Sequence, residues 1–165
     1  MNDLKFIYSG SFDPVTIGHA DIINRASALC GTLVVAVLCN SLKQPMFSVE
    51  DRIKMLNEVC EELKNVEIMS YDGLYADLIK DTKASVIVRG VRNLDDFEYG
   101  MQSCAYFNDR IPGCETILMP SRPEYLYISS TLVREHLKLG GTAEDLVPEK
   151  IRNIVENSNS EMRGK

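Results

Sequence analysis

Tyr8-Ser9-Gly10-Ser11-Phe12-Asp13-Pro14-Val15-Thr16-Ile17-Gly18-His19 is the stretch of this sequence that decides the fold. The apolar run that leads into it, at residues 5–8, predicts a strand, and Gly10 and Asp13-Pro14 then interrupt regular structure. After His19 the apolar residues recur at helical spacing, as Ile22, Ile23, Ala26 and Leu29. The stretch therefore predicts a strand, a loop and the start of a helix. Because a helix start presents free N–H groups and a positive dipole end, we expect an anion site there, to which His19 adds a charged or hydrogen-bonding donor.

Length and composition limit the class of protein. A chain of 165 residues predicts one domain covering residues 1–165, and 45% apolar with 25% charged residues is ordinary for a globular protein. The net charge of −6 argues against nucleic-acid binding, but it leaves room for a small anion held by a few local cations. No apolar run approaches the roughly 18 residues of a membrane span, and the N-terminus does not resemble a signal peptide. We therefore expect a cytoplasmic protein that binds neither nucleic acid nor membrane.

The cysteines are dispersed and form no C-x-x-C pair. They are Cys30, Cys39, Cys60, Cys104 and Cys114. This pattern predicts reduced, mostly buried thiols, and it argues against a zinc site because both the ligand spacing and the histidine partners are missing.

Five apolar segments predict strands, and helical patterns follow them. The strands are expected at residues 5–8, 33–39, 65–69, 85–88 and 116–119. The run at 33–39 is continuously apolar, which is typical of a strand buried on both faces. The alternation predicts an α/β fold, a doubly wound Rossmann-like five-stranded parallel sheet with helices on both faces. Extra C-terminal helices are expected after residues 129 and 148, and the polar tail from about residue 157 is expected to fray.

Groups that can bind phosphate follow each of the predicted strands. In a doubly wound sheet, the ligand lies beyond the carboxyl ends of the strands. The candidates there, in chain order, are Ser11, His19, Lys43, Gly73 to Tyr75, Arg89, Arg92, Tyr125 and Ser129 to Thr131. Because a net-acidic chain gathers its cations at one edge of the sheet, we predict a phosphate-binding site at that edge.

Each of these residues also has an ordinary structural explanation. A histidine at a helix start is more often a cap or a surface group, and Lys43 alone is an ordinary surface lysine. Arg89 and Arg92 can pair with nearby acidic residues in solvated ion pairs of little energy; the acidic residues are Asp95, Asp96 and Glu98. The hydroxyl residues at 129–131 can serve only as a helix cap. The shared edge of the sheet, rather than any single residue, favours the functional interpretation.

Taken together, the motifs resemble a known family. Gly10 to Pro14 with Thr16-x-Gly18-His19 resembles the signature of the nucleotidyltransferase superfamily. The T-x-G-H form of this signature and four further segments together resemble bacterial phosphopantetheine adenylyltransferases. The segments are Lys43 to Phe47, Arg89 to Arg92, Asp96 to Tyr99 and Ile128 to Thr131. The resemblance runs from Lys5 to about Val155.

The resemblance implies an enzyme that transfers the adenylyl group of ATP to 4′-phosphopantetheine. The products would be 3′-dephospho-coenzyme A and pyrophosphate, in the penultimate step of coenzyme A synthesis. It also implies Mg²⁺ with the ATP, dephospho-coenzyme A and coenzyme A as ligands, and a homohexamer built as a dimer of trimers. No general base is needed because the attacking phosphate oxygen is already ionised near neutral pH, so catalysis would consist of placement and charge stabilisation.

The resemblance further assigns roles to residues. His19 is expected to stabilise the transition state, with Lys43 and Arg92 as further catalytic residues. The acceptor site is expected to contain Ser11, Lys43, Leu74, Tyr75 and Arg89. The ATP site is expected to contain Ser11, Phe12, His19, Gly90, Val91, Arg92, Gly100, Tyr125, Leu126, Tyr127, Ile128, Ser129, Ser130 and Thr131. No residue is assigned to a metal.

Four positions depart from the family pattern. Ser11 stands where many relatives have Thr, Ser9 where Pro is common, Tyr75 where a smaller apolar residue is common, and Gly100 where a nucleotide-contacting Glu is common. Gly100 can therefore approach a nucleotide only with its backbone.

Two other functions stay open at this point. One is another nucleotidyltransferase of the superfamily, acting on a mononucleotide or a small phosphate ester; the Thr at position 16, where those enzymes commonly have His, argues against it. The other is a non-catalytic nucleotide-binding relative. The joint presence of Ser11, His19, Lys43, Arg89 and Arg92 argues against that reading.

Overall fold

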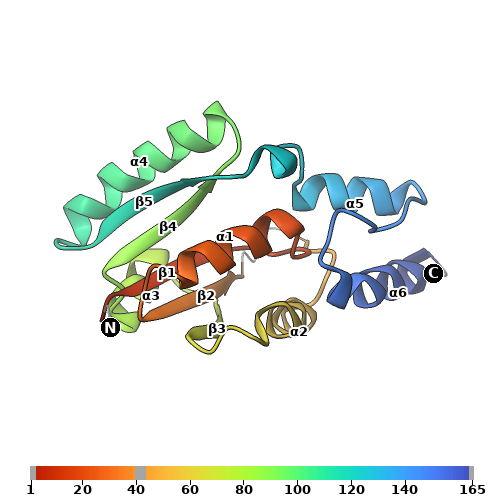
Figure 1. The fold of residues 1–165 in the computed structure, drawn as a ribbon, viewed down its shortest axis with the longest axis horizontal. Helices are drawn as coiled ribbons and strands as arrows, with labels where there is room; N and C mark the ends of the chain where they lie inside the picture. The colour runs from red at the N-terminus through yellow and green to blue at the C-terminus, as the bar shows by residue number, and fades with distance from the viewer. Residues whose placement is uncertain (1–2, 40–43, 164–165) are drawn as a thin grey trace.

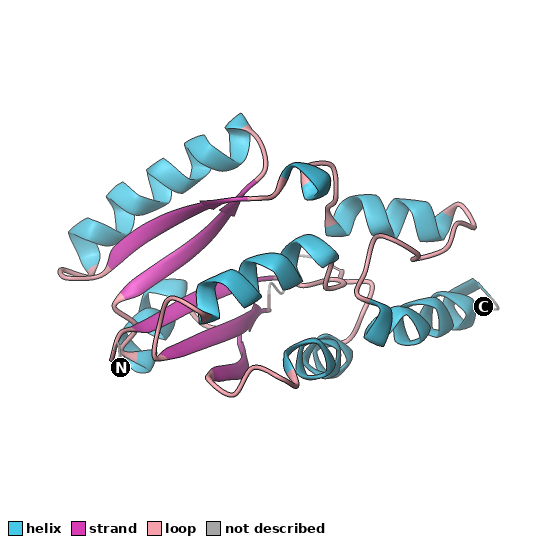
Figure 2. Cartoon of the chain, in the orientation of Figure 1, coloured by secondary structure: helices cyan, strands magenta, loops and turns pink. Residues whose placement is uncertain are grey.

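The computed structural model describes residues 3–39 and 44–163, which form one parallel sheet with helices on both faces (Figures 1 and 2). The strands are β1 (Lys5–Gly10), β2 (Thr32–Leu38), β3 (Val66–Tyr71), β4 (Val86–Val91) and β5 (Glu115–Pro120). The α-helices are α1 (Ile17–Ser27), α2 (Val49–Cys60), α3 (Tyr75–Thr82), α4 (Leu94–Arg110), α5 (Ser130–Lys138) and α6 (Arg152–Arg163). Two 3-10 helices, η1 (Pro123–Tyr125) and η2 (Glu149–Ile151), precede α5 and α6.

The strand order confirms the predicted doubly wound sheet. The order is β3-β2-β1-β4-β5, and every neighbouring pair is parallel. The chain builds outward from β1 to β3 on one side and then returns to add β4 and β5 on the other. The direction of winding therefore changes between β1 and β4, and the crevice at the carboxyl ends of these two strands is where such folds bind ligands.

Both faces of the central strands are buried, as the continuous apolar run in β2 predicts. Leu33 and Val35 face a core that includes residues of α1 and α2, whereas Val34 and Ala36 face a second core with residues of α3 and α4. All four side chains are at most 1% exposed. A strand that is covered on both faces can be apolar at every position, which is why polar and apolar residues do not alternate along β2.

The extra C-terminal helices lie beyond the carboxyl ends of the strands (Figure 1). Val133 of α5 and Val155 of α6 are fully buried and join the same core as α1 and α2. Helix α6 continues to Arg163, past the residue near 157 from which we expected the tail to fray, and no Gly or Pro interrupts residues 152–163. Among the described residues, no helix is both long enough and apolar enough to cross a membrane.

Strand β4 is longer than the sequence predicts. It extends to Val91 because residues 89–91 continue the ladder with β5, in the pairs Arg89↔Leu118, Gly90↔Met119 and Val91↔Pro120. The expectation that Arg89 follows the strand is therefore wrong. Because strand side chains alternate, Arg89 and Gly90 face opposite sides of the sheet.

Two loops at the carboxyl edge are joined by the buried carboxylate of Asp13, which is 5% exposed. Its two oxygens accept hydrogen bonds from the backbone N–H groups of Met46 (3.0 Å) and Phe47 (2.8 Å). The guanidinium of Arg134 lies 3.7 Å from the same carboxylate. Asp13 thus holds the loop after β1 against the segment that leads into α2.

We expect Asp13→Ala to lower the free energy of unfolding by about 2–4 kcal/mol, because the buried N–H of Phe47 and the partly buried N–H of Met46 lose their acceptor at about 1–3 kcal/mol each. Urea unfolding measures this as a lower midpoint with an unchanged slope. Asp109→Ala is the control, since the Asp109 side chain is 81% exposed and its removal is expected to change stability by less than about 0.5 kcal/mol. An Asp13→Ala midpoint equal to that of the wild type would contradict this role.

Candidate active site

A cleft of about 1030 Å³ opens where the carboxyl ends of β1 and β4 meet the starts of α1 and α5. This is large enough for a nucleotide and part of a second substrate. The cleft brings together ten of the residues predicted from the sequence, which are Ser11, His19, Gly90, Arg92, Leu126, Tyr127, Ile128, Ser129, Ser130 and Thr131. Segments far apart in the sequence therefore share one cavity at the predicted edge of the sheet.

His19 is fixed by a reciprocal cap at the start of α1. The hydroxyl of Thr16 accepts a hydrogen bond from the backbone N–H of His19 (3.3 Å), and the ring Nδ1 of His19 accepts one from the backbone N–H of Thr16 (3.1 Å). Because Nδ1 acts as an acceptor, the ring proton of the neutral imidazole resides on Nε2. The cap therefore selects the tautomer and leaves Nε2–H as the donor of the ring.

Burial, and in the same direction the positive charge of Arg92, lower the pKa of His19 to about 4. The imidazole is consequently neutral near pH 7. The sequence left open whether His19 is a charged or a neutral donor, and the surroundings of the ring favour the neutral form.

Aromatic rings pack around the imidazole. The ring of Phe12 lies 5.1 Å from that of His19, edge to face, and the ring of Tyr8 lies 6.5 Å away. Phe12 is 1% exposed and belongs to the core, so it packs against the His19 ring from the core side and does not line the cleft. Tyr8 does line the cleft, and burial raises the pKa of its hydroxyl, which stays protonated.

Arg92 forms a two-pronged ion pair with Asp96. The Nε and NH2 groups of Arg92 donate to the two carboxylate oxygens at 2.9 and 3.1 Å, and its backbone N–H donates to the same carboxylate at 3.0 Å. Burial alone would raise the pKa of Asp96, but the hydrogen bonds and charge of Arg92 outweigh this and keep that pKa below its usual value. The sequence allowed this pairing as an alternative, and the structure contains it.

Arg89 lies on the opposite face of β4, beside Tyr75 and Tyr99, whose ring centres are 5.3 and 5.5 Å from its guanidinium carbon. Three buried polar atoms occur here without a hydrogen-bond partner among the described residues, namely Arg89 Nε, Tyr75 Oη and Ser9 Oγ. Desolvation raises the pKa of Tyr75, and the charge of Arg89 partly offsets it. Unsatisfied buried groups are unfavourable, so their concentration at one point marks a place where a ligand can supply partners.

The start of α5 closes the cleft on its other side. The hydroxyl of Ser129 caps the helix by accepting from Leu132 N–H (3.1 Å), and the hydroxyl of Ser130 donates to the carbonyl of Pro14 (2.8 Å). Arg134, one turn further on, donates to the carbonyl of Asp13 (2.6 Å) and to the hydroxyl of Thr131 (3.2 Å). These bonds tie the first turn of α5 directly to the loop after β1.

Sequence reasoning missed two arginines of the cleft. Arg52 of α2 is 3% exposed and donates to the carbonyls of Ser11 (3.0 Å) and Ser48 (3.2 Å). No carboxylate in residues 3–39 or 44–157 lies within ion-pair distance of it in the structure. Arg134 was missed although it lies one turn after Thr131, a spacing that could have revealed it.

Several expected site residues do not line the cleft. They are Phe12, Leu74, Tyr75, Arg89, Val91, Gly100 and Tyr125. Gly100 is buried in α4, where a Cβ atom would come within 2.7 Å of the Leu118 side chain, so its backbone faces the sheet. Leu74 is 74% exposed. Lys43 lies outside the described residues.

Solved structures of adenylyltransferases have the same fold. A bifunctional NMN adenylyltransferase/ADP-ribose pyrophosphatase from Francisella tularensis, in complex with AMP and a manganese ion, superimposes with a TM-score of 0.71 at 16% identity, over 100% of this chain and 50% of that one. A putative nicotinate-nucleotide adenylyltransferase from Vibrio parahaemolyticus gives 0.64 at 17% identity, over 94% and 99%. This chain thus spans half the length of the bifunctional protein.

The fold, the cleft and the T-x-G-H cap together define a nucleotidyltransferase, and the model of the cytidylyltransferase-like family matches residues 7–136. Two curated phosphopantetheine adenylyltransferases are similar over most of their length. The protein from Caldanaerobacter subterraneus is 45% identical over 87% of this chain and 89% of its own, and that from Clostridium botulinum is 42% identical over 88% of each. The chain therefore belongs to the phosphopantetheine adenylyltransferase family, as the motifs indicate.

We expect the ring of His19 to remain neutral, with its proton on Nε2, as the free protein is titrated from pH 8 to pH 5. Because its pKa of about 4 lies below the ordinary value of 6.5, the folded state binds fewer protons than the unfolded state between these values. Stability contributed by His19 is therefore complete above pH 6.5 and is lost as the pH falls towards 4. Nitrogen-15 NMR of the imidazole tests this, with His19→Gln assigning the signal; a midpoint near 6.5 would contradict it.

Proposed function

We propose that this chain catalyses the reaction of ATP with 4′-phosphopantetheine to give 3′-dephospho-coenzyme A and pyrophosphate. The observation that carries this proposal is the 45% identity to a phosphopantetheine adenylyltransferase over 87% of the chain. The family model, at residues 7–136, includes every residue that lines the cleft, from Tyr8 to Arg134. Dephospho-coenzyme A and coenzyme A, which share parts with both substrates, are proposed as further ligands of the same cleft.

ATP is proposed to occupy the part of the cleft between α1 and α5. Two helix starts meet there, those of α1 and α5, and the positive dipole ends of helices bind phosphate. His19 Nε2–H, Arg92 and Arg134 would contact the phosphates, and the segment from Tyr125 to Thr131 would surround the nucleoside. The remaining residues proposed for ATP are Ser11, Phe12, Gly90 and Val91, of which Phe12 acts through its packing on His19, whereas Gly100 is buried against Leu118 and is not proposed as a contact.

The acceptor is proposed to approach Arg89 from the other side of β4. Arg89 has no carboxylate within ion-pair distance among the described residues, and its buried Nε lacks a partner, which suits it to a phosphate. Ser11, Tyr75 and Leu74 would border the same substrate. Lys43, which lies outside the described residues, is retained as a catalytic and acceptor-binding residue by its position in the family motif.

In the proposed mechanism a phosphate oxygen of the acceptor attacks the α-phosphorus of ATP. A new P–O bond forms as the bond to the bridging oxygen breaks, and the electron pair of that bond leaves with pyrophosphate. The oxygen is ionised beforehand, so no protein group needs to remove a proton. The neutral His19 donates a hydrogen bond from Nε2 to the charge that develops on the α-phosphate, and Arg92, oriented by Asp96, supplies positive charge.

Mg²⁺ is proposed to enter the cleft with ATP. In the described part of the chain, no group of three or more His, Cys, Asp or Glu side chains could hold a metal ion. Mg²⁺ is commonly held by substrate phosphates and water, with few protein ligands, and it would neutralise the charge of the triphosphate.

We infer that the enzyme works as one domain in the cytoplasm. Both apolar cores share the same sheet, which gives no boundary between parts of the chain. The five cysteines are free thiols in the structure, in keeping with a reducing compartment.

A pyrophosphate-release assay tests the activity. Wild-type protein, MgATP and 4′-phosphopantetheine are expected to yield pyrophosphate and dephospho-coenzyme A in equal amounts. Nicotinate mononucleotide with ATP, and glycerol phosphate with CTP, serve as competing acceptor and donor pairs. Release with one of these pairs and none with 4′-phosphopantetheine would refute the proposal.

We expect His19→Ala to lower kcat by roughly 100–1,000-fold, because one preorganised donor to the transition state is lost. His136→Ala is the matched control, since His136 is the only other histidine and lies exposed near the end of α5. Circular dichroism checks that both variants fold. A His19→Ala enzyme with nearly normal kcat would remove His19 from the mechanism.

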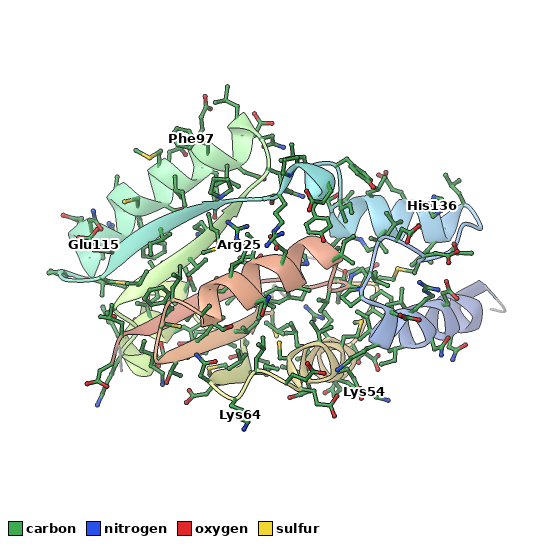
Figure 3. The ribbon with its side chains drawn as sticks, in the orientation of Figure 1. Arg25, Lys54, Lys64, Phe97, Glu115 and His136 are labelled. Atoms are coloured by element: carbon green, nitrogen blue, oxygen red, sulfur yellow. The ribbon has the colours of Figure 1, made fainter. Side chains whose placement is uncertain are left out.

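A homohexamer, arranged as a dimer of trimers, is proposed for the assembly. Helix α4 exposes large apolar side chains that are unfavourable in water, with Leu94 69%, Phe97 45% and Met101 51% exposed, and it packs beside the edge strand β5. Phe97 is labelled on the outer side of α4 in Figure 3.

Light scattering is expected to give the mass of six chains for the wild type and a smaller mass for the double variant Phe97→Glu, Met101→Glu. Charges placed in an apolar interface oppose association. Leu139→Glu is the control, because Leu139 is 88% exposed but follows α5. A monomeric wild type would contradict the hexamer, and a hexameric double variant would exclude α4 from its interfaces.

A further inference from the structure

The segment between β5 and α5 frames the nucleotide side of the cleft without being part of the sheet. Ser121, Leu126 and Tyr127 line the cleft, and Leu126 and Tyr127 remain 46% and 67% exposed. We call residues 121–128 the β5–α5 loop. After Ser121 N–H, which donates to the carbonyl of Val91, its backbone bonds are local, as in Tyr125 N–H to Arg122 and Ile128 N–H to Tyr125. Something other than the strand ladder must hold this loop in place.

One face of α1 provides that support. Gly18, Asp21 and Arg25 are three and four residues apart, so they share one face of the helix. A Cβ at Gly18 would lie 3.7 Å from Tyr125 Cβ, and Arg25 donates to the carbonyl of Pro120 (2.9 Å). Arg25, labelled in Figure 3, extends from α1 towards the end of β5.

The carboxylate of Asp21 is the centre of this contact. One oxygen lies 2.8 Å from Nε of Arg122, in the loop, and the other lies 2.9 Å from Arg25 on α1 itself. The Asp21 side chain is 10% exposed, whereas that of Arg122 is 56% exposed. A largely buried carboxylate shared by two guanidinium groups is a stronger restraint than a single surface ion pair, because its own desolvation is compensated only while both partners stay in place.

The same helix carries His19 two residues before Asp21, in the capped first turn. Any displacement of the loop relative to Asp21 is therefore also a displacement relative to the Nε2–H of His19. The clamp formed by Asp21, Arg25 and Arg122 thus sets the distance between the nucleoside side of the cleft and the group that contacts the reacting phosphate.

We propose that Asp21 is a positioning residue for the nucleotide, which acts by clamping the β5–α5 loop to α1 through Arg122. The proposal rests on the proposed function in that ATP occupies this side of the cleft. Asp21 touches no substrate; it holds the residues that do. Its removal should weaken ATP binding and leave the acceptor, which lies against the opposite face of β4, nearly unaffected.

Steady-state kinetics of Asp21→Asn, Arg122→Gln and the double variant test this role. We expect KM for ATP to rise about fivefold to tenfold in each, equivalent to about 1–1.4 kcal/mol. KM for 4′-phosphopantetheine and kcat should stay within about twofold. The double variant should resemble Asp21→Asn, because both substitutions break the same contact between Asp21 and Arg122. Glu124→Gln, which removes an equal charge from the exposed part of the same loop, is the matched control and should behave as the wild type.

Hydrogen exchange of the amides of Tyr125 and Ile128 gives a second readout that needs no activity. Exchange should become faster in Asp21→Asn and not in Glu124→Gln. Unchanged KM for ATP in Asp21→Asn and Arg122→Gln would overturn the proposal. A rise in KM for 4′-phosphopantetheine as large as that for ATP, together with an equal fall in kcat, would also overturn it, because this result indicates general misfolding. If Asp21→Asn fails to fold, the exposed Arg122→Gln decides alone. If the wild type is inactive but amide exchange in the β5–α5 loop is still faster in Asp21→Asn, the proposed function is refuted and the role of Asp21 in holding the loop is retained.

Discussion

The carboxylate of Asp13 is the interaction on which the rest of the site depends. It accepts the N–H groups of Met46 and Phe47, while the carbonyl of the same residue accepts from Arg134. One residue thereby joins the loop after β1, the segment before α2 and the first turns of α5. These segments end different strands or start different helices, and nothing in the sheet itself fixes their mutual distance. Ser130 and Arg52 add hydrogen bonds to the carbonyls of Pro14 and Ser11, so the junction at Asp13 is reinforced from α5 and α2.

The charged groups in the cleft, together with Arg89 on the other face of β4, are of two kinds. Arg92 is matched by Asp96, and Arg134 lies 3.7 Å from Asp13, so both are oriented before any ligand arrives. In contrast, Arg52 and Arg89 lie beyond ion-pair distance of every carboxylate among the described side chains. His19 stays neutral because burial and Arg92 both oppose its protonation. A net-acidic protein can in this way attract a polyphosphate with unmatched cations and still present donors of fixed geometry at the reacting atom.

Much of this was predictable from the sequence. The pattern of apolar residues predicts the presence of every strand and α-helix, and the T-x-G-H motif predicts that His19 lies at the start of a helix. The tautomer of His19 was not predictable, because it depends on a backbone N–H of Thr16 that only the cap geometry brings to Nδ1. Arg52 and Arg134 were not predictable from the ends of the strands, because both lie within helices and donate to backbone carbonyls of the loop after β1. Arg89 was expected after the fourth strand but lies within it, because the ladder with β5 lengthens β4 beyond its apolar run.

The central claim is that both substrates meet at the carboxyl ends of β1 and β4 and that phosphate attacks phosphate directly, with hydrogen-bond donors and cations but no protein nucleophile. The stereochemistry at phosphorus tests this most directly. ATP made chiral at the α-phosphorus, by one sulfur and one oxygen-18 substitution, is turned over with 4′-phosphopantetheine, and the configuration of the product is read by phosphorus-31 NMR. A single in-line transfer predicts inversion of configuration. Retention would require two displacements through an adenylylated residue and would contradict the account.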